Sequence, residues 1–220
     1  MCAYVLMKVL ESSERRYDLG MEILTLGNEV KAKIEIASRI APGERVLDLG
    51  VGTGTLAIYC ADRGAEVLGI DVSPAMIQLA EEKVSRSGLE GRVRLKGMSV
   101  VEMDDLPEVS FDTVVATFLF SELSEDEQLY ALTEVHRVLK PCGRIIILDE
   151  SIPSTLTERS IQLLVRIPLL VLTLLVAQTK TTPLRGIHER LSEAGFQMET
   201  EISYFLGSLR LVIGCKEAGR

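Results

Sequence analysis

The chain has 220 residues, 47% of them hydrophobic and 25% charged, which is enough to bury the core of a single domain. Its formal net charge of -8, without any run rich in Lys or Arg, argues against broad binding to nucleic acid. Four cysteines without a CxxC pair, and two histidines, predict reduced thiols and no metal site. We expect a cytoplasmic protein, because the amino terminus lacks the pattern of a cleaved secretion signal.

The first 40 residues carry apolar side chains at loosely helical spacing, including Tyr4, Met7 and Leu10. Such spacing predicts two short helices.

Residues 45–71 predict an apolar strand, a glycine-rich turn, a short helix and a second strand that ends on an acid. Gly50, Gly52 and Gly54 let the backbone pass close to a ligand, because no Cβ blocks the approach. Asp71 can accept hydrogen bonds from both hydroxyls of a ribose. The segment therefore predicts a site for a nucleoside-like ligand, with an ordinary tight turn as the alternative.

The glycine pattern is GxGxG and follows Asp48, whereas the fingerprint for dinucleotides is GxGxxG. A carboxylate at this place favours a sulfonium and an ammonium group and would repel a pyrophosphate. The segment resembles motif I of class I S-adenosylmethionine-dependent methyltransferases, in which the turn holds the amino acid end of the cofactor.

Beyond residue 71, helices and strands alternate, which predicts parallel βαβ units. Ser73 and Pro74 are typical of a helix start, and Lys140-Pro141 of a helix end. The expected elements are a helix from 74 to about 88, a strand at 92–96, a strand at 111–117, a helix at 125–139 and a strand at 143–149.

The carboxyl-terminal part predicts two strands, 197–206 and 209–216, joined by a type II′ turn at Gly207-Ser208. The methyltransferase fold also ends with an antiparallel strand. The expected fold class is therefore α/β, a doubly wound, mostly parallel seven-stranded sheet of the Rossmann-like methyltransferase type, with an antiparallel terminal hairpin.

The resemblance covers residues 40–216 and is closest over 44–150, where the chain is similar to the ubiquinone/menaquinone methyltransferase-like (type 11) group. The run LKPCGRIIILDE is a further match. Residues 4–18 bear a weaker resemblance to methyltransferases associated with corrinoid proteins. The resemblance implies one domain over 1–220: a helical lid (1–40), a cofactor-binding core (41–150), a variable helical segment for the acceptor (151–195) and the hairpin (196–217).

The resemblance also implies a set of residues that bind S-adenosylmethionine. One departure is Met98-Ser99, where the family usually has an acid and a small residue. Met98 could pack on the adenine or belong to the core, and adenine would then rely on backbone groups at Ser99 or on Glu102. The implied residues are Tyr17, Asp48, Gly50, Gly52, Gly54, Asp71, Val72, Met76, Met98, Ser99, Thr117 and Phe118.

No catalytic residue is assigned, because methyl transfer from a sulfonium relies mainly on positioning. His188 and Tyr17 are the candidates, with a solvated histidine and a packing tyrosine as the alternatives. His136 is expected to be a surface or capping histidine rather than a base. Asp149 and Glu150, at the carboxyl end of a strand, are expected either to orient a substrate or to end the strand.

The most apolar stretch is 161–177, which is interrupted by Arg166 and Pro168 and is too short to span a membrane. It is expected to be core, an apolar acceptor pocket, a homodimer face or a contact with a membrane surface.

The resulting hypothesis is methyl transfer from S-adenosylmethionine to a small hydrophobic acceptor, without nucleic acid as a partner. The alternatives are a regulatory protein that binds the cofactor without catalysis, and a nicotinamide-dependent reductase.

Overall fold

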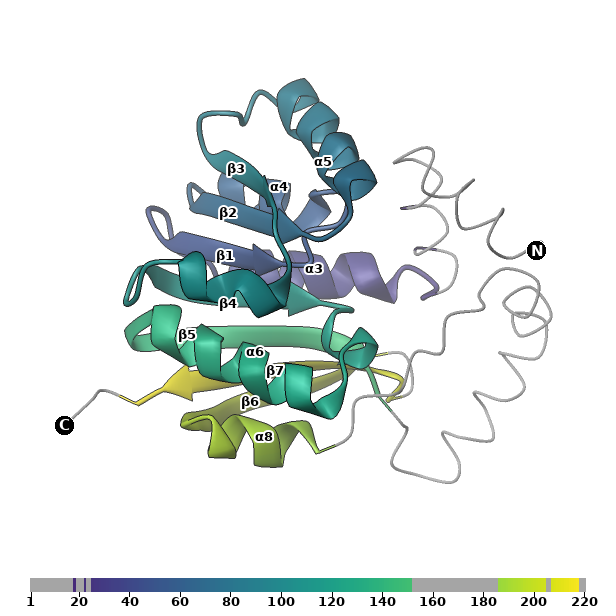
Figure 1. Ribbon diagram of the computed structural model, residues 1–220. Helices are drawn as coiled ribbons and strands as arrows, with labels where there is room; N and C mark the ends of the chain where they lie inside the picture. Colours follow the sequence, from purple (N-terminus) through teal and green to yellow (C-terminus); the bar gives the residue numbers. More distant parts are fainter. Residues whose placement is uncertain (1–17, 19–21, 23–24, 152–185, 205–206, 218–220) are drawn as a thin grey trace, which may run out of the picture.

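The computed structural model describes residues 18, 22, 25–151, 186–204 and 207–217. These residues form a seven-stranded sheet in the order β3-β2-β1-β4-β5-β7-β6, with helices on both faces (Figure 1). The strands are β1 (Arg45–Leu49), β2 (Glu66–Asp71), β3 (Val93–Gly97), β4 (Phe111–Thr117), β5 (Leu139–Glu150), β6 (Phe196–Tyr204) and β7 (Leu209–Lys216). The predicted fold class is confirmed, because β7 runs antiparallel to both of its neighbours and the other pairs are parallel.

The strand order places a topological switch point at β1. The chain runs outward from β1 through β2 to β3, and then returns to β4 on the other side of β1. Ligands of open α/β sheets bind outside the carboxyl ends of the strands at such a point. The fold therefore directs attention to the segments that follow β1, β2 and β4.

The helices divide the core into two apolar layers. Helices α3 (Asn28–Ser38), α4 (Thr55–Asp62) and α5 (Pro74–Arg86) cover one face, and α6 (Glu125–Val138), α8 (Ile187–Glu193) and the 3₁₀ helix η1 (Val100–Asp105) cover the other. In Figure 1, α6 and α8 lie in front of the sheet, whereas α3 and α4 lie behind it. Because both faces are covered, the central strands are apolar on both sides.

Side-chain caps start the helices where the sequence predicts them. Ser73 caps α5 by accepting a hydrogen bond from Met76 N at 3.4 Å, with Pro74 in the first turn. Ser124 and Glu127 form a reciprocal capping box at the start of α6. These caps satisfy amide donors that a helix leaves unpaired, so they fix where each helix leaves the sheet edge.

Two predicted boundaries are wrong. β5 begins at Leu139, not at 143, because Leu139 already pairs with Phe111 before a register shift in β4. The type II′ turn at Gly207-Ser208 is also wrong: Tyr204 pairs with Leu209, so four residues connect the strands. The structure ties this connection to the end of β5, since Ser151 N donates to Ser208 O at 2.9 Å.

The described residues contain no helix that is both long and apolar enough to cross a bilayer. Residues 161–177 lie outside the described residues, as does most of the predicted lid. Their roles stay predictions, as does the division of the chain into segments of one domain.

Gly69 in β2 provides a test of the packing beneath the glycine turn. A Cβ there would lie 2.7 Å from Val51 Cγ2 and 2.9 Å from Leu95 Cδ2, whereas a Cβ at Gly97 in β3 meets nothing within 4 Å. We expect Gly69→Ala to lower the free energy of unfolding by about 1–3 kcal/mol through overpacking. Gly97→Ala is the matched control and should be close to neutral. Equal midpoints of the two variants in urea denaturation would contradict the packing argument.

Candidate functional site

The structure gathers most of the predicted site residues at the carboxyl ends of four adjacent strands. The glycine turn follows β1, Asp71 ends β2, Met98 follows β3 and Thr117 ends β4. Because neighbouring strands are about 4.8 Å apart, these residues line one continuous edge at the switch point. The sequence spacing and the sheet topology thus agree on the location of a site.

The three glycines of the turn have positive φ angles of 67°, 52° and 77° at Gly50, Gly52 and Gly54. A Cβ on Gly50 would lie 3.3 Å from Leu119 Cδ1, and one on Gly54 would lie 3.2 Å from the Cβ of Ala80 in α5. A Cβ on Gly52 would meet nothing closer than Gly50 O at 4.0 Å. Two glycines therefore serve internal packing, and Gly52 keeps backbone accessible to a ligand.

Asp71 connects the end of β2 to both neighbouring segments. Its Oδ2 accepts a hydrogen bond from Gly52 N at 2.9 Å, and its Oδ1 accepts one from Ser73 N at 2.8 Å. Each carboxylate oxygen has a second lone pair, so the side chain can still accept bonds from a ligand. Asp71 can therefore shape the turn and bind a ribose with the same carboxylate.

Asp48 is a buried carboxyl group without a hydrogen-bond partner in the described part of the chain. It is 1% exposed, and neither Oδ1 nor Oδ2 is paired. Burial raises the pKa of Asp48 to about 7, with Lys33 acting in the opposite direction and Asp71 in the same one. A buried acid that changes charge near neutral pH is costly for folding, and such groups cluster at functional sites.

The residues that follow β2 and β3 differ in their burial and in their contacts. Met98 is 5% exposed and belongs to the apolar core, which favours the core over the adenine as the place where this side chain packs. Ser99 and Glu102 cap η1 through a reciprocal box, with Ser99 N donating to Glu102 Oε2 at 2.8 Å. Met76 is buried in the first turn of α5. Val72, by contrast, is 75% exposed and offers an apolar surface beside Asp71.

The end of β4 contains a strained residue. Phe118 has a φ of 56° although it is not glycine, and its amide donates to Leu148 O at 2.8 Å. Backbone of this kind costs about 1–3 kcal/mol and is found preferentially at functional sites. Thr117 is half-buried directly before it, on the strand that adjoins the switch point.

The candidate catalytic residues gain no geometric support. Tyr17 lies outside the described residues. His188 Nε2 lies 2.9 Å from Glu201 Oε2 of β6, five strand steps from β2, or roughly 24 Å from Asp71 at the usual strand spacing. The role of each stays a prediction.

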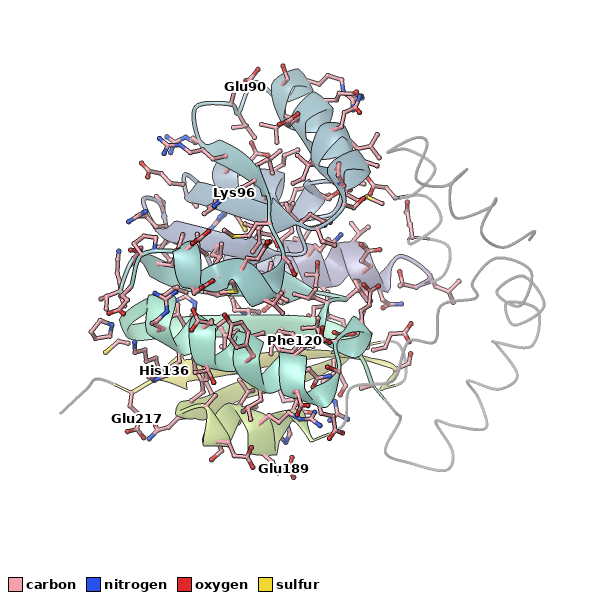
Figure 2. The ribbon with its side chains drawn as sticks, viewed as in Figure 1. Glu90, Lys96, Phe120, His136, Glu189 and Glu217 are labelled. Atoms are coloured by element: carbon pink, nitrogen blue, oxygen red, sulfur yellow. The ribbon has the colours of Figure 1, made fainter. Side chains whose placement is uncertain are left out.

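His136 is half-buried in the last turn of α6, where the sequence predicts a surface or capping histidine. Its ring packs edge-on against Phe196 at 5.4 Å, and burial together with Lys216 lowers its pKa. Figure 2 shows His136 and Phe120 toward opposite edges of the sheet, and Phe120 follows β4 at the edge that carries the glycine turn.

Three further acidic residues lie at this edge; the sequence pointed to Asp149 as a residue that orients a substrate or ends its strand, whereas Glu122 and Asp18 escaped the prediction of the site. Burial, together with Asp149 and Asp71, raises the pKa of Glu122 in η2 (Phe120–Glu122). Asp149 is buried and accepts hydrogen bonds from Ser121 N at 2.9 Å and Glu150 N at 2.7 Å. The third is Asp18, whose Oδ1 accepts from Thr53 Oγ1 at 2.7 Å. The available signal for Glu122 and Asp149 was an acid at or shortly after a buried strand.

Comparison with known proteins gives these features a family. Residues 46–143 match the family model of a methyltransferase domain. This part of the chain is therefore similar to the methyltransferase domains of that family. The chain is 37% identical over 143 residues to the demethylmenaquinone methyltransferase of Thermus thermophilus. The matched region covers 61% of this chain and 60% of that protein.

One further relative and one solved structure are also similar to this chain. The chain is 41% identical over 109 residues to the phosphatidylethanolamine N-methyltransferase of Cereibacter sphaeroides, covering 50% of this chain and 52% of that protein. Its fold is similar to the magnesium protoporphyrin IX methyltransferase of Synechocystis, solved with bound SAH, with a TM-score of 0.65, 20% identity and 93% and 88% of the two chains covered. This chain spans about three fifths of the length of the quinone methyltransferases that it matches.

The cofactor of this family is S-adenosylmethionine, and the residues present fit it. Gly52 leaves its backbone open to a ligand, Asp71 keeps acceptor capacity, and the unpaired carboxyl of Asp48 suits a cationic group nearby. The match to a methyltransferase domain argues against the alternative of a nicotinamide-dependent reductase.

The raised pKa of Asp48 makes the stability of the ligand-free protein depend on pH. In the unfolded chain Asp48 ionises near pH 3.8, whereas the folded protein keeps the proton until about pH 7. Between these values the folded state binds one more proton, so the free energy of unfolding falls as the pH rises and levels off above about pH 7.

Asp48→Asn removes this titration. We expect its stability relative to the wild type to increase from about pH 4 to pH 7, by on the order of 4 kcal/mol at most, and then to stay constant. Guanidinium denaturation at a series of pH values measures the difference.

Asp112→Asn is the matched control. Burial alone would raise the pKa of Asp112, but the hydrogen bonds from Lys140 and Arg45 lower it overall. Its difference from the wild type should therefore be constant above about pH 5. A constant difference for Asp48→Asn as well would contradict the assigned titration.

Proposed function

We propose that this protein transfers the methyl group of S-adenosylmethionine to a small hydrophobic acceptor. The observation that carries the proposal is the edge at the switch point, where the space beside Gly52 is open, Asp71 presents a carboxylate and Asp48 is buried without a partner in the described part of the chain. Each of the three matches a different chemical part of the cofactor. An ordinary strand-to-helix turn would not account for the combination of these three features.

The residues at this edge each bind a different part of the cofactor. Asp71 binds the ribose hydroxyls with the lone pairs that Gly52 N and Ser73 N leave available. Val72 covers one face of the adenine with its exposed side chain. The turn at 50–54 holds the amino acid end, and Asp48 stabilises positive charge there. Thr117 and Phe118 border the same end from β4.

When bound, S-adenosylmethionine supplies an electrophilic methyl group on a sulfonium whose departure leaves a neutral thioether. The protein therefore has to bind, orient and shield the reactants, and positioning of this kind can provide most of the acceleration. This is consistent with a site that brings together no catalytic triad among the described residues. Glu122, with its raised pKa, is the acid at this edge that is suited to accept a proton from an acceptor that must lose one.

Two observations favour a hydrophobic acceptor. The names of the similar proteins state demethylmenaquinone, ubiquinone or menaquinone biosynthesis, and phosphatidylethanolamine as their substrates or pathways. The sequence also places its most apolar stretch, 161–177, in the segment where this family binds its acceptors. We propose that this stretch contributes to an apolar acceptor pocket.

Cofactor binding is tested by titration calorimetry with S-adenosylhomocysteine. We expect Asp71→Ala to weaken binding about tenfold or more, because a charge-assisted hydrogen bond to the ligand is lost. Asp71→Asn should lose less, since one oxygen acceptor remains. Asp126→Ala in the first turn of α6 is the control and should bind like the wild type. Equal affinity of Asp71→Ala and the wild type would refute the ribose assignment.

Methyl transfer is tested with S-adenosylmethionine that carries a labelled methyl group and a total lipid and quinone extract. We expect label to enter the organic phase with the wild type and to fall about tenfold or more with Asp71→Ala when the cofactor is not saturating, because the variant binds the cofactor more weakly. Mass spectrometry of the labelled product then identifies the acceptor. A protein that binds the cofactor and labels neither the organic nor the aqueous fraction would support the regulatory alternative.

A further inference from the structure

Asp18 contacts Thr53 and Thr55 at the start of α4, although they follow it by 35 and 37 residues in the chain. Its Oδ1 accepts a hydrogen bond from Thr53 Oγ1 at 2.7 Å, and its Oδ2 accepts one from Thr55 Oγ1 at 3.4 Å. Lys83 of α5 completes the cluster: its Nζ donates to Asp18 Oδ2 at 2.5 Å and to Thr55 Oγ1 at 2.6 Å. Three separate segments therefore meet at this point.

The cluster supplies what the start of α4 lacks. The N-cap of α4 is Gly54, with a φ of 77° and no side-chain hydrogen bond to the helix. The first amide groups of a helix carry partial positive charge and favour a nearby anion. The carboxylate of Asp18 provides that anion, and Lys83 fixes its position. Thr53, which is 3% exposed, stands directly between Gly52 and Gly54.

We propose that Asp18 and Lys83 are positioning residues for the cofactor site. Their ion pair holds Thr53 and Thr55, and through them keeps the Gly52–Gly54 backbone in the conformation that binds the cofactor. The inference rests on the proposed function. It assigns neither residue a contact with the cofactor, because both side chains lie against the threonine hydroxyls.

We expect substitution of Asp18 or Lys83 to weaken cofactor binding by more than it lowers the free energy of unfolding. The side chains of Asp18 and Lys83 are 33% and 17% exposed, and ion pairs with this much solvent access contribute about 0–1 kcal/mol to stability. The bond from Gly52 N to Asp71 holds the first part of the turn, whereas the cluster holds the part that leads into α4 through the hydroxyls of Thr53 and Thr55. A merely structural pair would change stability and affinity in parallel.

The experiment measures the dissociation constant of S-adenosylhomocysteine by calorimetry and the unfolding midpoint for each variant of the full chain. We expect Asp18→Asn and Lys83→Met each to weaken binding about five- to tenfold, because each removes charge-assisted hydrogen bonds to the threonine hydroxyls. The double variant should be no weaker than the weaker single one, because the two residues act as a unit. Lys83→Arg should restore binding to within about twofold of the wild type, since the charge is retained.

Glu82→Gln is the matched control, because Glu82 adjoins Lys83 on α5 and its Oε1 accepts an exposed hydrogen bond from Gln78 at 3.2 Å. It should leave both measurements unchanged. Wild-type affinity in both Asp18→Asn and Lys83→Met would overturn the inference while leaving the proposed function intact. A loss of affinity that only accompanies a large fall in the unfolding midpoint would overturn it too. Failure of the wild type to bind S-adenosylhomocysteine would overturn both.

Discussion

The carboxylate of Asp71 is the interaction on which the rest of the site depends. It ends β2, and its two oxygens accept hydrogen bonds from the amides of Gly52 and Ser73. The first bond fixes the glycine turn that follows β1, and the second fixes the segment that starts α5. A single side chain thus sets the relative position of the segments that follow β1 and β2. A binding site on rigid elements requires preorganisation of this kind.

The neighbouring Asp48 shows the opposite relation between structure and stability. Its buried oxygens have no partner within the described residues, and desolvation raises its pKa to about 7, so the folded protein carries an acid that opposes folding at neutral pH. The strained φ of Phe118 lies at the same edge and adds a further cost. Both features become reasonable if this edge is shaped for a cationic ligand, because selection for binding tolerates local losses of stability.

Much of this architecture could be predicted because local signals agree with one another. Ser73-Pro74 marks the start of α5, the apolar runs at β1, β2 and β4 are separated by clear turns, and the spacing from Gly52 to Asp71 reflects one strand-turn-helix-strand unit. Helix α3 lies inside the segment 1–40 that was predicted to be helical, but the sequence gave no signal for its own bounds. Its buried face includes Ala32, Ile36 and Ala37, while Val30 and Ile34 alternate with polar residues at a period of two, which hides the helical stripe. The connection at Gly207-Ser208 was mispredicted because a glycine-first pair does not fix the strand register.

The long-range contacts of the site could not be predicted from the sequence. Nothing local connects Asp18 with Thr53 or Lys83, and Met98 could be placed in the core only once its neighbours were known. The most direct test of the account is a crystal structure of the complex with S-adenosylhomocysteine. The account predicts both ribose hydroxyls within hydrogen-bond distance of the Asp71 carboxylate, with the amino acid end against the turn at Gly52. A ligand that binds elsewhere, or a ribose that leaves Asp71 uncontacted, would contradict it.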